Sequence, residues 1–200
     1  MKLLTVRRCY AAAASFPISS VRGLGPNSRP ASLRKLGSTL QAEDKTMSNL
    51  PHGIRLNNPG NLRRAVMPAG ALGIIDGFQA FDTMETGLAN LFVLSMNYYT
   101  KLGLRTVPTF IARYAPASEN DLMQYEQLMC RFCNINPLKA GTQDINLIDE
   151  WCLVAWCRGI IRVENGRPGA NWPTMMEWFT VAELAAALKR AQEWKSEQSV

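Results

Sequence analysis

The chain has 200 residues, of which 47% are hydrophobic, and its formal net charge is +6. This length suits one globular domain with a sizeable core, and no apolar run approaches the roughly 20 residues that a membrane-spanning helix needs. Residues 1–46 hold eight basic and two acidic side chains, whereas residues 47–200 hold 14 of each. Charge therefore gives no indication of a nucleic-acid-binding surface on the second part.

Residues 1–46 are rich in Ser, Arg, Ala and Pro and have no helical or strand periodicity. We expect a disordered basic extension here, followed by a single helical domain over residues 47–200. An Arg-rich, acid-poor start resembles a mitochondrial transit peptide. Met47 opens a sequence that reads as a natural beginning, so residues 1–46 are also interpreted as a translated upstream region without a function.

An asparagine-rich turn follows in His52–Arg64, HGIRLNNPGNLRR. Its side-chain amides are candidates for binding sugar hydroxyls and acetamides, or they satisfy the loop's own backbone. The candidate ligands are Asn57, Asn58 and Asn61. His52 is the only histidine, which excludes a histidine-based triad and a multi-histidine metal site.

The rest of the chain predicts a mostly α fold of about five helices, with a glycine- and asparagine-rich loop or short hairpin region. Asp76 and Gly77 are placed to form the hairpin turn. The predicted helices are Thr83–Lys101 capped by Thr83, Thr106–Tyr114, Glu119–Phe132 capped by Ser118, Asp144–Gly166, and Thr180–Lys195. Glu85 lies in the first turn of the first predicted helix. It is the runner-up candidate for a catalytic carboxylate, and the alternative is that it only complements the helix dipole.

The helix predicted over residues 144–166 is the most informative. Its apolar positions fall at a spacing of three and four, which predicts a buried face made of Ile148, Trp151, Cys152, Ala155, Gly159, Ile160 and Val163. We expect Asp144 or Thr142 to cap its start and Gly166 to end it. Glu164 then lies in the last turn on the apolar side, and both positions oppose its ionisation.

A carboxylic acid kept neutral near pH 7 is what a general acid needs to protonate a sugar leaving group, so Glu164 is the first catalytic candidate. The alternative is a structural Glu164 paired with Arg162, Arg167 or a backbone amide. Trp172 follows in the next loop, where it stacks on a sugar ring or anchors the core.

Four cysteines form two pairs, Cys130 with Cys133 and Cys152 with Cys157, and raise the question of a four-thiolate metal site. Both pairs lie inside helical patterns, and residues five apart on a helix diverge by more than a quarter turn. We therefore expect buried free cysteines, with no metal and no other cofactor.

The segments GIRLNNPGNLRR, FQAFDTMETGLANL, TVPTFIARYAPASENDLMQYEQLM and IIRVENG occur in this order. Together they resemble a group of bacteriophage and prophage virion proteins of lysozyme-like type, related to the structural protein P5 group. The resemblance covers about residues 52–168 and implies a lysozyme-like helical domain. IIRVENG also looks like the IIRVESG that ends the catalytic helix of soluble lytic transglycosylases, with Asn165 in place of the serine. That resemblance implies an acid and base role for Glu164 and makes Asn165 a candidate for substrate binding.

The resemblance implies cleavage of the β-1,4 glycan strand of peptidoglycan by a virion-associated protein. Such a protein resides in the virion, or in the bacterial cytoplasm before assembly, and reaches the periplasm or cell wall if it is muralytic. One carboxylic acid suffices for a transglycosylase, whereas a hydrolase needs a partner, for which Asp76, Asp82 and Glu85 are candidates. The alternative function is a non-catalytic phage structural or cell-wall-binding protein, whose partners are glycan or other virion proteins.

Overall fold

A computed structural model describes residues 50–63, 69–115, 121–168 and 177–198. These residues all belong to one compact unit, Asp44–Val200. The predictions for residues 1–46 and for Trp172 lie outside the described residues.

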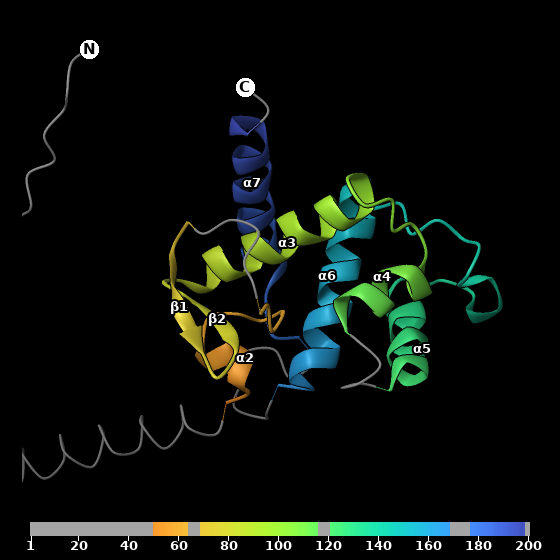
Figure 1. The fold of residues 1–200 in the computed structure, drawn as a ribbon, viewed down its shortest axis with the longest axis horizontal. Coiled ribbons are helices and arrows are strands. Elements are labelled where there is room, and N and C mark those ends of the chain that lie inside the picture. The colour runs from red at the N-terminus through yellow and green to blue at the C-terminus, as the bar shows by residue number, and fades with distance from the viewer. Residues whose placement is uncertain (1–49, 64–68, 116–120, 169–176, 199–200) are drawn as a thin grey trace, which may run out of the picture. The chain divides into compact units, whose positions relative to one another are not determined.

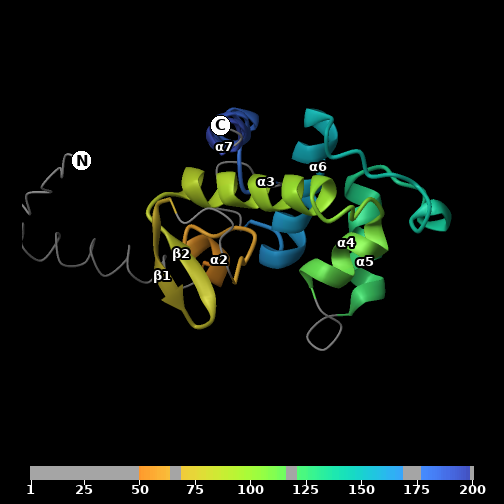
Figure 2. The same ribbon diagram turned by 45° about the horizontal axis from the view of Figure 1, so that its top comes forward.

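The described chain is mostly helical, as predicted (Figure 1). Its elements are α2 (His52–Arg55), β1 (Ala71–Ile75), β2 (Phe78–Phe81), α3 (Met84–Thr100), α4 (Val107–Tyr114), α5 (Leu122–Phe132), a 3-10 turn (Pro137–Lys139), α6 (Glu150–Asn165) and α7 (Val181–Glu197). The helix α3 packs against α6 and α7, and α5 packs against α4 and α6 (Figure 2). Among the described helices, none has the length and hydrophobicity to cross a membrane.

Short polar side chains begin the long helices by accepting a hydrogen bond from a backbone N–H of the first turn. Thr83 does so for α3, as predicted, by accepting from the N–H of Thr86. The predicted start of α5 is wrong, because Asp121 caps the helix, which starts at Leu122, three residues later than predicted. The predicted cap, Ser118, lies outside the described residues.

The predicted start of α6 is also wrong, since neither Asp144 nor Thr142 caps it. Asp149 is the N-cap and accepts from the N–H of Cys152 at 2.9 Å. Asp144 instead accepts from the Tyr99 hydroxyl at 2.8 Å and from the N–H of Asn146 at 2.6 Å. Its carboxylate therefore stabilises the loop that precedes α6. Gly166 follows the last helical residue with a φ of 67°, as the sequence predicted for the helix end.

The buried face of α6 differs in part from the predicted one. Ile148 and Trp151 are 70% and 81% exposed, because the helix begins only at Glu150 and the first turn projects into solvent. The buried stripe is Leu153, Trp156, Cys157, Gly159, Ile160 and Ile161. Trp156 is fully buried and meets the ring of Phe110 edge to face at 4.8 Å.

The predicted hairpin turn is confirmed. Asp76 and Gly77 both have positive φ, 51° and 83°, as the two central residues of a tight hairpin turn require. They join β1 to β2 in an antiparallel pair in which Ile75 faces Phe78. Phe81 at the far end of β2 is buried, whereas β1 is mostly exposed.

Residues 56–62, here called the asparagine loop, lie directly against the first turns of α3. A Cβ on Gly87 of α3 would overlap the carbonyl oxygen of Asn57. Only a glycine at position 87 allows the two backbones to approach this closely. The position of the loop is therefore set by the surface of α3.

We predict that Gly87→Ala lowers the free energy of unfolding by about 2 kcal/mol or more, because the added methyl group forces the loop off the helix. Chemical denaturation measures the change. Gly141→Ala is the matched control, since a Cβ there meets no atom within 4 Å, and it should change stability by less than about 0.5 kcal/mol. Equal effects of the two substitutions would contradict the prediction.

Candidate active site

Glu164 lies half-buried in the last turn of α6, and both oxygens of its carboxylate accept a hydrogen bond. The side-chain amide of Asn61 donates to Oε2 at 2.8 Å, and the hydroxyl of Tyr125 donates to Oε1 at 2.9 Å. The three residues come from the asparagine loop, from α5 and from α6. Segments that are distant in sequence are thus joined at one carboxylate.

Burial raises the pKa of Glu164 above its ordinary value of 4.5. The hydrogen bonds from Asn61 and Tyr125 and the charge of the Arg63 guanidinium act in the opposite direction and do not cancel the burial. This agrees with the sequence-based expectation. The alternative, an ion pair with Arg162 or Arg167, is not found among the described residues, where the Arg162 guanidinium donates to the carbonyl of Gly166 at 3.4 Å.

Two tyrosines from α4 and α5 lie beside Glu164. Burial, followed by the charge of Glu164, raises the pKa of both Tyr125 and Tyr114 well above 10. The Tyr114 hydroxyl donates to the carbonyl of Gly60 and so ties α4 to the asparagine loop. Both hydroxyls remain protonated at neutral pH, so the acid is surrounded mainly by neutral groups. The sequence analysis did not predict the contact of Tyr125 with Glu164.

Asn57 and Asn58, both predicted to bind substrate, use their amides to hold the backbone in place. Asn57 has a φ of 52° and donates to the carbonyls of Phe81 and Asp82 at 3.1 and 3.3 Å. Asn58 is fully buried. It donates to the carbonyls of Leu62 and Gln79 at 2.9 and 2.7 Å and accepts from the N–H of Leu62 at 2.8 Å. Both amides therefore satisfy backbone groups, which is the alternative to sugar binding that the sequence left open.

Asn61 and Asn165, the other two described asparagine candidates, meet at Gly53. Asn165 is 7% exposed and donates to the carbonyls of Pro59 and Ile161 at 2.6 and 3.0 Å. A Cβ on Gly53 would lie within 3.0 Å of the Oδ1 atoms of both Asn61 and Asn165. Neither oxygen has a hydrogen-bond donor within the described chain. Gly53 was not predicted to belong to the site, although it lies within the asparagine-rich segment His52–Arg64.

The other candidate carboxylates have partners elsewhere. Glu85 forms an ion pair with Arg190 of α7 at 2.6 Å. Asp76 lies 3.5 Å from His52, and Asp82 accepts from the N–H of Thr83 at 2.7 Å. None of the three takes part in the hydrogen bonds of Glu164. A role of Glu85 in catalysis remains a prediction.

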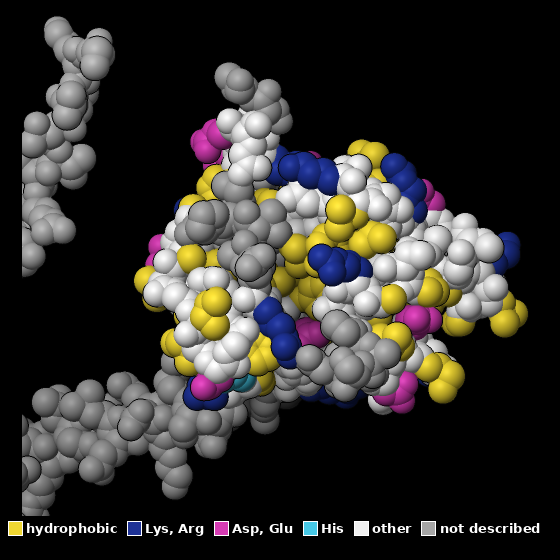
Figure 3. All heavy atoms as spheres, viewed as in Figure 1, with side chains coloured by type: hydrophobic (Ala, Val, Ile, Leu, Met, Phe, Trp, Pro, Cys, Tyr) yellow, Lys and Arg dark blue, Asp and Glu magenta, His cyan; other side chains and the backbone are white. Residues whose placement is uncertain are grey.

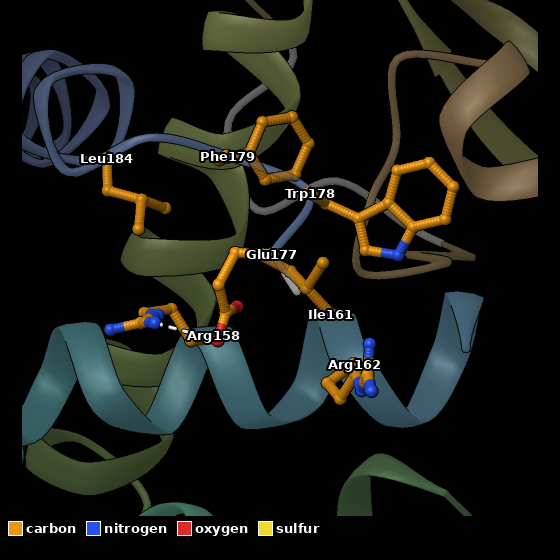
Figure 4. Close-up of a pocket in the computed structure, with 7 residues that line it drawn as sticks. All are labelled: Arg158, Ile161, Arg162, Glu177, Trp178, Phe179 and Leu184. Atoms are coloured by element: carbon orange, nitrogen blue, oxygen red, sulfur yellow. Dashed lines mark ion pairs between the residues drawn. The ribbon is translucent and has the colours of Figure 1, made fainter. Parts of the chain in front are cut away.

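A small pocket lies between α6 and the segment leading to α7 (Figure 4). Arg158 forms an ion pair with Glu177 across it at 2.8 Å. The indole N–H of Trp178 donates to the carbonyl of Gly166 at 2.9 Å. Trp178 thus satisfies a carbonyl just beyond the end of α6 and helps to fix the turn that carries Glu164.

The four cysteines of the described chain are free thiols. Burial raises the pKa of Cys133 and Cys157 to about 12, so both remain protonated at neutral pH. In the described residues, no group of three or more His, Cys, Asp or Glu side chains is arranged to hold a metal ion.

Comparison with protein-family models and with curated proteins finds no match for this chain.

We predict that Glu164→Gln gains stability relative to the natural chain as the pH rises from below 4.5 through the raised pKa of Glu164. The folded chain holds the Glu164 proton more tightly than the unfolded chain, so the stability that this proton contributes is complete below 4.5 and is lost as the pH rises. Denaturation of both chains across this range measures the difference. Glu197→Gln, at an exposed position, is the control and should follow the natural chain. A constant difference between Glu164→Gln and the natural chain would contradict the prediction.

Proposed function

We propose that this protein cleaves the β-1,4 glycan strand of peptidoglycan as a virion-associated, lysozyme-like enzyme. The observation that supports this most directly is the half-buried carboxyl of Glu164, whose pKa burial raises and whose two oxygens are oriented by Asn61 and Tyr125. A raised pKa and a fixed orientation are the two properties that a general acid requires. The resemblance of the IIRVENG segment to the catalytic helix of lytic transglycosylases assigns the same role to the same residue.

A lytic transglycosylase reaction fits a single acid best. In that reaction the Glu164 carboxyl gives its proton to the glycosidic oxygen, and the bond from the anomeric carbon to this oxygen breaks. The same carboxylate then accepts the proton of the sugar's 6-hydroxyl, whose oxygen attacks the anomeric carbon to give a 1,6-anhydro end. The three carboxylates considered as partners for a hydrolase are engaged with His52, Arg190 and a backbone N–H. This arrangement favours the transglycosylase over the hydrolase.

The second candidate is a non-catalytic virion structural protein, and one feature of the hairpin favours it. Leu72, Ile74 and Ile75 of β1 are 72%, 64% and 48% exposed. Figure 3 shows apolar side chains at the surface in this region. Apolar side chains on an edge strand suit packing against another protein subunit.

The test is the loss of turbidity of purified Gram-negative peptidoglycan incubated with the full chain. We predict clearing by the natural chain, release of products with anhydro-sugar ends, and a rate at least about 100-fold lower for Glu164→Gln. Glu197→Gln is the control and should clear at the natural rate. Circular dichroism must show that each variant is folded.

Two outcomes would contradict the proposal. Clearing that survives Glu164→Gln would move the chemistry elsewhere, with Glu85→Gln the next variant to test. A folded natural chain that clears no peptidoglycan would favour the structural candidate.

A further inference from the structure

Two buried acceptors without donors lie next to the candidate acid. The Oδ1 atoms of Asn61 and Asn165 have no hydrogen-bond donor in the described chain. Both lie within 3.0 Å of the same point, the position that a Cβ of Gly53 would take, so they are less than 6 Å apart. Two buried acceptors without donors at such close positions are unfavourable and call for an explanation.

The amide of Asn61 can remove both defects by half a turn about its Cβ–Cγ bond. Its nitrogen then faces Asn165 Oδ1, which it reaches directly or through one bridging water. Its oxygen then faces Oε2 of Glu164, which the amide nitrogen now contacts at 2.8 Å. An oxygen at this place is satisfied only if Glu164 carries a proton on Oε2 and donates it.

We propose that Asn61 is a positioning residue that turns its amide with the protonation of Glu164, and that Asn165 is the acceptor that stabilises the turned state. With Glu164 ionised, Asn61 donates to the carboxylate and both Oδ1 atoms lack donors. With Glu164 neutral, one hydrogen bond runs from the acid O–H to Asn61 Oδ1 and a second runs from Asn61 Nδ2 to Asn165 Oδ1. The proton moves between Glu164 and solvent or substrate, and the amide loses and gains none.

The other groups around the acid do not provide such a switch. Tyr125 of α5 and Tyr114 of α4 are neutral hydroxyls, and Tyr125 can donate to Oε1 or accept from it without any rearrangement of its ring. Arg63, which follows the asparagine loop, is exposed and favours the ionised acid. The neutral form is therefore favoured by burial and by the turned Asn61 amide.

The inference uses the acid of the proposed function, but its test needs no substrate. In the natural full chain, the side-chain carboxyl carbon of Glu164 is titrated by NMR, and the nuclear Overhauser contact between the Asn61 side-chain amide protons and the Gly53 Hα protons is followed in parallel. We expect this contact to be strong below the Glu164 midpoint, to weaken above it, and to change with the same midpoint. The side-chain amide of Asn58, fixed by backbone partners, is the control and should keep its contacts at every pH. A contact from Asn61 to Gly53 that is the same at all pH values would overturn the proposal.

Asn165→Leu gives a second test, because the proposed switch and a purely structural role of Asn165 predict different shifts of the Glu164 titration midpoint. Leucine removes the acceptor, so the turned state loses its partner and the Glu164 midpoint should fall by about 0.5 to 1 pH unit. If Asn165 were only a structural residue, the more apolar side chain would raise the midpoint or leave it unchanged. Asn165→Ala, which also removes the acceptor, serves in its place if the leucine variant does not fold, with the same expected direction. A chain that clears no peptidoglycan but shows the coupled midpoints would refute the proposed function and retain the switch.

Discussion

The asparagine loop depends on the buried amide of Asn58, and the candidate site depends on the loop. A loop without regular secondary structure leaves its N–H and C=O groups without ladder partners, and each buried group without a partner costs about 1 to 3 kcal/mol. Asn58 supplies three of the missing hydrogen bonds, two to the backbone of Leu62 and one to Gln79. The loop is thereby fixed to β2, and Asn61 is held against Glu164.

The acid is fixed from the helical side by a different set of contacts. Trp156 and its neighbours bury one face of α6 against the core, which determines the direction of Glu164, and Trp178 satisfies the carbonyl of Gly166 just beyond the helix end. Asn165 then connects α6 to the loop through the carbonyl of Pro59. A side chain held by a helix on one side and a fixed loop on the other has little freedom, as the orientation of a catalytic group requires.

The sequence predicted the features that depend on adjacent residues. Asp76 and Gly77 form a hairpin turn because each tolerates a positive φ, and Thr83 and Gly166 bound their helices through contacts within one turn. The direction of the Glu164 pKa shift was predicted from its place in the last turn of an apolar helix, whereas its cause in the structure is burial.

Features that depend on distant residues were not predicted. The spacing of apolar residues in α6 is compatible with several neighbouring faces. Packing against other elements, such as the contact of Phe110 with Trp156, selects the buried stripe, and Trp151 is left exposed. Gly53 and Asn165 lie far apart in the sequence, so the residues next to Gly53 do not indicate that it contacts the side chain of Asn165. The contact from Tyr125 to Glu164 joins two helices whose packing the sequence alone does not fix.

The choice of an amide partner for Glu164 has a chemical consequence. An arginine in direct contact donates at every pH and would hold the carboxyl ionised, which is unsuitable for an acid that must carry a proton. An asparagine presents a donor and an acceptor on the same planar group, so it can contact the ionised or the neutral carboxyl at the same site. Asn61 in direct contact, with the charge of Arg63 acting from an exposed position, therefore orients Glu164 without requiring its ionisation. Orientation and a raised pKa, which oppose each other when a cation binds a carboxylate, are compatible here because the direct partners are neutral.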